Sequence, residues 1–394
     1  MKKLVGLAGM LVLACLFQGC GRNTGYVPEN AKYDKSFTAM DTYMTFAAYG
    51  KNAENGLEDA RRRVQEIENI CSVTREGSEI YGVNHRTENT VSLGKESAKL
   101  LREAMTISER SGGAFDVTMY PVLQLWGFTD GKYQVPGEEA LKEALGKTGY
   151  QKINVDTDGV ELEAGMEIDF GGIAKGYAGD EAAVALKNAG VKSAILSLGG
   201  NIQTVGTKPD GSDWNVAIKD PEHTDQYMGV LKVSNQAVVT SGGYERYFEQ
   251  DGKKYWHILD PKTGYPAQSG LLSVTVTGSS GMECDALSTA FFVMGLEKAI
   301  NYYQNYGGIE AVFLTDTKEV WVTQGLKKSF TLTGDYEKDS IHYKYIIYIF
   351  HLSPKVTNPF VHRTFKPLTV LFQSITQSFI FHHLSHSKEQ LFLS

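Results

Sequence analysis

Residues 169–201 read DFGGIAKGYAGDEAAVALKNAGVKSAILSLGGN, a glycine-rich loop followed by an alanine-rich segment and a short apolar run. The spacing of apolar residues predicts a helix over residues 176–189, which Gly190 ends. The run over residues 194–198 predicts a strand directly after this helix. A helix therefore alternates with a strand in the middle of the chain, and glycine-rich loops lie on both sides of the pair.

The same reading extends outward to the rest of the chain. Helical spacing of apolar residues predicts further helices over residues 53–70, 97–111 and 285–294. Strands are predicted where β-branched and aromatic residues concentrate, over residues 33–49, 230–240, 255–259 and 271–277. The mixture predicts an α+β fold, with a mixed, largely antiparallel sheet and packed helices.

Composition narrows the class of protein. The 394-residue chain is 42% hydrophobic and 22% charged, which is ordinary for a globular protein. Its formal net charge of −7 provides no clustered basic face, so nucleic acid is excluded as a partner. Only Cys71 and Cys284 lie in the body of the chain, and their spacing indicates no zinc site or CxxC motif.

The N-terminus has the pattern of an export signal. Lys2 and Lys3 precede an apolar stretch that is too short to span a bilayer comfortably, and Gly19 stands directly before Cys20. We expect residues 1–19 to be a lipoprotein signal peptide, Cys20 to carry the lipid, and residues 20–35 to be a linker. The protein would then be anchored to the extracytoplasmic side of the cell membrane. An ordinary cleaved signal, a retained anchor and lipidation at Cys15 are the alternatives.

The C-terminus differs in composition from the rest. Six of the nine histidines follow residue 340, among many aromatic and β-branched residues and no glycine. Such a change marks a boundary, so we expect a main domain over residues 36–335 and a poorly ordered extension over residues 336–394. The histidine spacing is too irregular to predict a metal site.

Four glycine-rich stretches stand out in the main domain, at residues 111–116, 169–176, 198–201 and 240–244. Glycines beside Ser, Thr and Asp allow backbone groups to approach a ligand closely. None of the four is a P-loop or a dinucleotide-binding GxGxxG motif. Together they predict the wall of a cavity that is large enough for a nucleotide.

Two further segments carry residues suited to chemistry. His257 ends a predicted strand just before a turn fixed by two prolines and a glycine, where a general base could be held. Asp285, Ser288 and Thr289 share one face of a predicted apolar helix. A buried carboxylate beside hydroxyls suits magnesium, and a core hydrogen-bonded group is the alternative.

These segments, in this order, resemble the ApbE family of FAD:protein FMN transferases, or flavin-trafficking lipoproteins, over residues 36–335. The matching motifs are Met40-Asp41-Thr42, Gly113-Ala114-Phe115-Asp116, Leu125-Trp126-Gly127-Phe128, residues 169–177, Gly199-Gly200-Asn201, Thr240-Ser241-Gly242, residues 257–266 and residues 285–289. The resemblance implies an ApbE-like, T-fold-related fold. It also implies magnesium-dependent transfer of the FMN half of FAD onto a threonine or serine hydroxyl of an acceptor flavoprotein, with release of AMP. The acceptors would belong to membrane redox complexes or to extracellular electron transfer.

The resemblance also implies the site residues. FAD, as substrate, would contact Met40, Thr74, Asp116, Val117, Thr118, Asp169, Lys175 and Leu259. His257 and Asp285 would be catalytic, and Mg²⁺ would be held by Asp285, Ser288 or Thr289 and the backbone carbonyl of Gly172. The family usually has glycine where this chain has Asp41, which adds a charge near the flavin.

Two other functions would use the same pocket. Water in place of threonine would make the protein an FAD pyrophosphatase that yields FMN and AMP. A lipoprotein that only carries FAD would need no base beside a metal site, so His257 and Asp285 argue against it.

Overall fold

The computed structural model describes residues 28–156, 159–333 and 344–346. The predicted signal peptide with Cys20, and the C-terminal extension apart from residues 344–346, lie outside the described residues. Within the described part of the chain, no helix is both long enough and apolar enough to cross a membrane.

A nine-stranded sheet forms the centre of the fold. Its strands lie in the order β1 (Lys32–Ala39), β2 (Thr42–Tyr49), β6 (Ser193–Leu198), β7 (Asn201–Val205), β10 (Ala237–Gly242), β13 (Leu271–Gly278), β14 (Glu310–Thr315), β15 (Val320–Thr323) and β17 (Lys344–Ile346). Every neighbouring pair is antiparallel except β15 and β17, which are parallel. The predicted α+β class with a largely antiparallel sheet is therefore confirmed.

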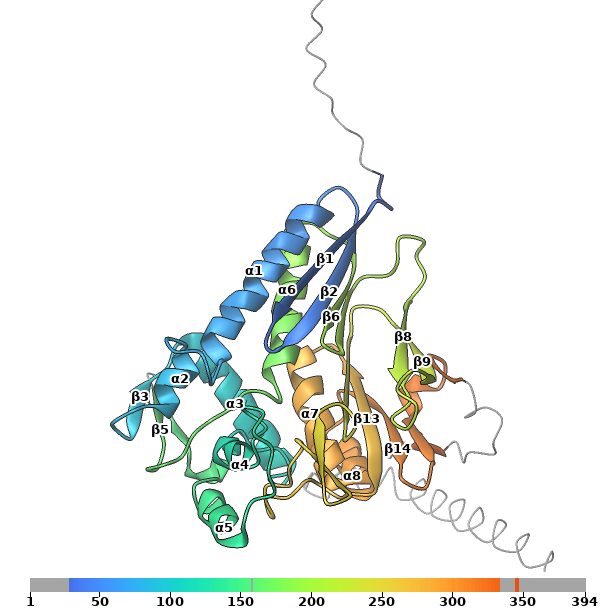
Figure 1. The fold of residues 1–394 in the computed structure, drawn as a ribbon. Helices are drawn as coiled ribbons and strands as arrows, with labels where there is room; N and C mark the ends of the chain where they lie inside the picture. Colours follow the sequence, from blue (N-terminus) through green and yellow to red (C-terminus); the bar gives the residue numbers. More distant parts are fainter. Residues whose placement is uncertain (1–27, 157–158, 334–343, 347–394) are drawn as a thin grey trace, which may run out of the picture. The chain divides into compact units, whose positions relative to one another are not determined.

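Helices pack on one face of this sheet. They are α1 (Ala53–Cys71), α6 (Ala174–Asn188), α7 (Gly281–Met294) and α8 (Leu296–Tyr306), and Figure 1 shows α1 and α6 side by side. In α1, Leu57, Val64 and Ile67 recur at helical spacing and are buried in the main hydrophobic core with Phe46 of β2. Burial of this apolar stripe fixes the helix against the sheet.

A second sheet packs on the other face. It contains β16 (Phe330–Leu332), β9 (Tyr227–Val233) and β8 (Trp214–Lys219), in that order. Val216 and Leu231 from this sheet share a core cluster with Val312 and Val322 of the large sheet. The described residues thus form three layers, with helices, the large sheet and the small sheet in succession.

Shorter elements form the remainder of the described residues. They are α2 (Glu79–Asn84), β3 (Thr90–Ser92), α3 (Lys95–Arg110), α4 (Tyr120–Leu125), α5 (Glu138–Gly146), the 3₁₀ turn Tyr150–Lys152, β4 (Asn154–Val155), β5 (Gly159–Glu161), the hairpin of β11 (Tyr247–Gln250) and β12 (Lys253–Trp256), and the 3₁₀ turn Gln324–Leu326. A third core cluster joins α4 and α5 to the chain after β12. At its centre, the Trp126 indole N–H donates to the Gly264 carbonyl at 2.8 Å.

Three predicted strands were wrong in extent. Residues 33–49 form a hairpin, because Met40 and Asp41 turn the chain with φ of 51° and 57°. Two residues of positive φ make the tight turn that suits twisted strands, and aspartate tolerates this conformation better than most residues. Residues 230–240 divide at Asn235 (φ 53°) into β9 and β10, which lie in different sheets. The strand predicted over residues 255–259 ends at Trp256.

Helices α6 and α7 touch at Gly176. Its N–H donates to Asp285 Oδ2 at 2.8 Å. A Cβ at this position would lie 2.0 Å from the Gly281 carbonyl oxygen and 2.7 Å from Asp285 Cβ. Only glycine therefore allows the two helices to approach this closely.

We expect Gly176→Ala to lower the free energy of unfolding by about 1–3 kcal/mol, because the added methyl group overpacks this helix contact. Urea denaturation of the full chain measures the change. Gly82→Ala in α2 is the matched control, since a Cβ there meets nothing within 4 Å. The control should leave stability equal or raise it by about 0.4–1 kcal/mol. Equal stability of the two variants would contradict the prediction.

Candidate active site

Several turns meet at one end of the large sheet. The β1–β2 turn at residues 40–41 and the β6–β7 turn at residues 199–200 lie at the same end, because β2 and β6 are antiparallel neighbours with Met44 opposite Leu198. β10 ends at Gly242 on this side, beyond its pairing with β7. The sheet register thus brings segments that are distant in sequence to one place.

A cavity of about 760 Å³ lies at this end, within the range of small-molecule sites. All four glycine-rich stretches contribute residues to its wall, which confirms the predicted cavity. The wall also includes Lys219 and Thr224 near the end of β8, residues of the segment 257–261, and Asp285 and Thr289 of α7.

Of the eight residues expected to contact FAD, seven line the cavity: Met40, Thr74, Asp116, Val117, Asp169, Lys175 and Leu259. Thr118 does not line it and is fully buried. The backbone N–H and the hydroxyl of Thr118 both donate to Asp116 Oδ1, at 2.9 and 2.6 Å. Thr118 therefore acts on the cavity through Asp116, and contact of these residues with FAD stays a prediction.

The Asp116 carboxylate ties two loops together. Its Oδ2 accepts the Tyr150 N–H at 3.0 Å, and the Thr118 hydroxyl oxygen accepts the Gly149 N–H at 2.7 Å. Burial raises the pKa of Asp116, while these hydrogen bonds oppose the rise. The Asp116 carboxyl group thus holds one wall of the cavity in place through these hydrogen bonds.

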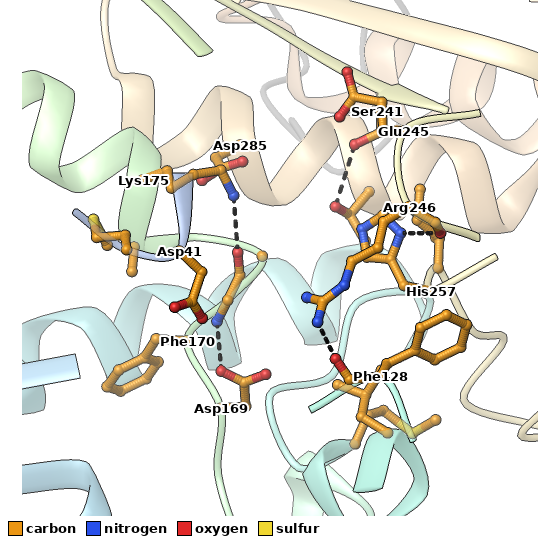
Figure 2. A pocket seen from close by; sticks show the side chains of 18 of the residues that line it. Asp41, Phe128, Asp169, Phe170, Lys175, Ser241, Glu245, Arg246, His257 and Asp285 are labelled. Carbon is orange, nitrogen blue, oxygen red and sulfur yellow. Dashed lines mark hydrogen bonds between the residues drawn. The ribbon is translucent and has the colours of Figure 1, made fainter. Parts of the chain in front are cut away.

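Asp169 lies on the loop that enters α6, and Lys175 is the second residue of this helix. Asp169 Oδ1 accepts the Gly171 N–H at 2.8 Å, and Lys175 Nζ donates to the Gly171 carbonyl at 3.4 Å. Burial raises the pKa of Asp169, and the charges of Lys175 and Arg246 partly offset this. Figure 2 shows Asp169 and Lys175 on one side of the cavity, together with Asp41, and His257 with Arg246 on the other.

Three oxygen donors gather beside α7. The Asp285 side chain is 5% exposed, and of its carboxylate oxygens only Oδ2 accepts a hydrogen bond from the described residues. A Cβ at Gly172 would be 3.8 Å from Thr289 Oγ1, so the Gly172 backbone and this hydroxyl are neighbours. One carboxylate, one hydroxyl and a backbone carbonyl form an all-oxygen set, which fits a hard cation such as Mg²⁺.

Ser288 lies apart from these donors. It is fully buried and does not line the cavity. Its hydroxyl donates to the Asp285 carbonyl at 2.8 Å and lies 2.8 Å from Ser241 Oγ. Thr289 is thus the hydroxyl of this pair that faces the cavity, although the role of either residue as a metal ligand stays a prediction.

His257 is held by one backbone carbonyl. The backbone N–H and the ring Nδ1 of His257 both face the Arg246 carbonyl oxygen, at 3.1 and 3.2 Å. A carbonyl only accepts hydrogen bonds, so Nδ1 carries the proton and Nε2 is left with a free lone pair. Burial lowers the pKa of His257 to about 4; the bond to Arg246 opposes this, and the charges of Arg246 and Lys175 support it. The ring is therefore neutral at pH 7.

Four charged residues of the cavity wall were not predicted from the sequence: Glu68, Lys219, Glu245 and Arg246. The Arg246 guanidinium donates to the Phe128 carbonyl, which ties the histidine-bearing segment to the chain after α4. Glu245 and Arg246 directly follow a glycine-rich stretch, and this position was the available signal. The sequence around Lys219 gave no such signal, because Lys219 ends a strand in which exposed residues alternate with buried ones, and an exposed lysine is ordinary there.

The fold and the site define an α+β protein with a nucleotide-sized cavity, whose wall contains a histidine held by a backbone carbonyl and, across from it, the side chains of Asp285 and Thr289. Residues 40–313 match the ApbE family. The FAD:protein FMN transferase of Treponema pallidum is 32% identical over 338 residues, which cover 80% of this chain and 93% of that protein. The FAD:protein FMN transferase of Klebsiella pneumoniae is 33% identical over 308 residues, covering 77% and 95%.

Solved structures agree with this relationship. The ApbE protein of Thermotoga maritima has a TM-score of 0.71 and 32% identity, and the match covers 75% of this chain and 98% of that one. The flavinyl transferase ApbE of Pseudomonas stutzeri, in its apo form, has a TM-score of 0.67 and 28% identity, covering 77% and 99%. The chain belongs to the ApbE family, as the motifs predicted.

We expect the His257 ring to titrate near pH 4 in the folded protein, well below the ordinary value of 6.5. The unfolded chain then binds the proton first, so stability falls as the pH drops from about 6.5 to about 4. An NMR titration of the ring protons measures the midpoint, and His257→Gln assigns the signal by its loss. A midpoint at or above 6.5 would show that the site does not keep this ring neutral.

Proposed function

We propose that this protein transfers the FMN half of FAD onto a threonine or serine hydroxyl of an acceptor protein and releases AMP. The observation that carries the proposal is that one cavity contains His257, which is neutral at pH 7, together with the oxygen-bearing side chains of Asp285 and Thr289. The transfer reaction needs both groups, a base for the acceptor hydroxyl and a cation for the diphosphate. Two relatives, of which this chain covers 93% and 95%, are named for the same reaction.

In the proposed step, the acceptor oxygen attacks the phosphorus atom of the FMN half. The P–O bond to the AMP half breaks, AMP leaves, and a phosphoester bond to the acceptor forms. His257 Nε2 takes the hydroxyl proton. Its lone pair is free to do so because the proton of the neutral ring is on Nδ1, which donates to the Arg246 carbonyl. Lys175, a cation on the cavity wall, would balance charge on the diphosphate.

Asp285, Thr289 and the Gly172 carbonyl would hold Mg²⁺, which neutralises diphosphate charge when it is bound. The Gly176 N–H keeps Asp285 in one orientation. Ser241 and Ser288 form a hydroxyl pair behind the site, and Ser241 Oγ lies 3.4 Å from Thr289 Oγ1. These contacts orient the donors before any cation arrives, which favours tight geometry.

Mass spectrometry tests the transfer directly. The full chain in detergent is incubated with FAD, Mg²⁺ and peptides that carry one central threonine between randomised residues. We expect a gain of one FMN per labelled peptide, loss of the signal on chelation of Mg²⁺, and a rate roughly 10²–10⁴-fold lower for His257→Ala. Free FMN and AMP without labelled peptide would indicate the pyrophosphatase instead. FAD that stays intact would indicate a carrier.

The proposal includes attachment to the membrane. The pattern around Cys20 supports lipidation after export, and FAD and acceptor flavoproteins of membrane redox complexes or extracellular electron transfer would be the partners. A lipid anchor confines enzyme and acceptor to one surface, which raises the rate at which they meet.

We expect Cys20→Ser to move the protein from the membrane fraction to the soluble fraction and to remove its lipid mass. Cys15→Ser is the matched control, because Cys15 is the competing cysteine of the same segment. The control should stay in the membrane and keep the lipid. A lipid lost with Cys15→Ser and kept with Cys20→Ser would overturn the assignment of Cys20.

A further inference from the structure

Glu245 is a carboxylate on the cavity wall that the proposed reaction does not use. It follows Tyr244, which also lines the cavity, and precedes Arg246. Glu245 is exposed, and among the described residues its carboxylate accepts no hydrogen bond and forms no ion pair within 4 Å, while the charges of Lys175 and Lys219 act on it from further away. An ionisable group at the wall of a binding cavity with no protein partner has its hydrogen-bonding capacity available for a ligand.

The surroundings of Glu245 are polar and mixed in charge. A Cβ at Gly200 would lie 3.7 Å from Glu245 Oε1, so this carboxylate lies over the turn that leads into Asn201. The Asn201 side chain is 7% exposed, lines the cavity, and its Nδ2 has no partner among the described residues. Two polar side chains without protein partners therefore lie on the same part of the wall.

Charge complementarity decides what Glu245 can bind. FAD carries a diphosphate, which a carboxylate repels, and the charges of Lys175 and Lys219 offset only part of this repulsion at Glu245. A peptide segment offers backbone N–H groups and a hydroxyl, which are the donors that a carboxylate accepts, and hydrogen bonds to charged groups are the stronger kind. The unpaired carboxylate thus suits the acceptor better than the phosphates of FAD.

The position of Glu245 also suits the acceptor. It adjoins Arg246, whose carbonyl holds His257 in the tautomer with a free Nε2. Figure 2 shows Glu245 on the same side of the cavity as Arg246 and His257, across from Asp41 and Asp169. A segment bound at Glu245 would therefore present its hydroxyl near His257.

We propose that Glu245 binds the acceptor protein, accepting hydrogen bonds from the backbone beside the reactive hydroxyl, and that Asn201 lines the same subsite. This inference rests on the proposed transferase function and assigns a residue to its second substrate. Glu245 is then a determinant of acceptor affinity and not of FAD affinity.

Glu245→Gln tests the assignment with the peptide that the wild-type enzyme labels most strongly. We expect the KM for this peptide to rise roughly 10–100-fold, the cost of losing a hydrogen bond to a charged group. The KM for FAD and the Kd of FAD binding should stay within about twofold of the wild type. Glu245→Asp, which keeps the charge, should recover part of the affinity for the peptide.

Glu249→Gln is the matched control, since Glu249 lies four residues further on in β11 and does not line the cavity. It should leave both KM values unchanged. A rise in the KM for FAD alone, or an unchanged KM for the peptide in Glu245→Gln, would overturn the assignment. A wild-type enzyme that labels no peptide would instead refute the transferase function itself, so the two failures are distinct.

Discussion

The structure depends on a buried carboxylate between two helices. Asp285 needs a partner because a buried charge without one is costly, and the Gly176 N–H provides it. Asp180 of α6 repeats the arrangement at the start of α7, where it accepts the N–H groups of Gly281 and Met282 at 2.7 and 3.0 Å. Helix α6 thus binds α7 at two points, through Gly176 and Asp180. These contacts fix the position of Asp285 and Thr289 on the cavity wall.

This helix contact also explains the glycines of the central segment. A larger residue at Gly176 would meet the backbone of α7, and a larger residue at Gly172 would meet the Phe115 ring at 2.9 Å. The loop before α6 can therefore lie against both α7 and the chain after α3. Close backbone approach brings the Gly172 carbonyl, Thr289 and Asp285 to one side of the cavity, where a cation would meet only oxygen.

The opposite wall is organised by the Arg246 segment. The Arg246 carbonyl fixes the histidine tautomer, and its guanidinium bonds to the Phe128 carbonyl. Behind it, Trp126, Phe128 and Phe248 pack with ring centroids 5.8 to 6.5 Å apart. Aromatic packing of this kind gives the His257 segment a rigid support, which the proposed role of His257 as a general base would need because proton transfer depends on short, well-aligned contacts.

The sequence by itself determined the helices, the fold class and most of the cavity wall. The spacing of apolar residues predicted α1, α3 and α7 to within a few residues, because the side chains that such a helix buries recur at helical intervals along the sequence. Motif order identified the family and placed seven of the eight expected FAD contacts on the cavity wall, since these residues lie in loops whose glycines and acids are visible locally.

Tertiary structure alone decided the rest. Residues 33–49 read as one strand because a turn at Met40 and Asp41 depends on positive φ, which these residues adopt only when β1 and β2 pair. Only the structure shows that Thr289 faces the cavity while Ser288 packs against Ser241 behind it. The sequence does not distinguish the two because they are neighbours on one helix. Lys219 reaches the cavity because strands and turns that are distant in sequence meet there, and the sequence around Lys219 gives no sign of it.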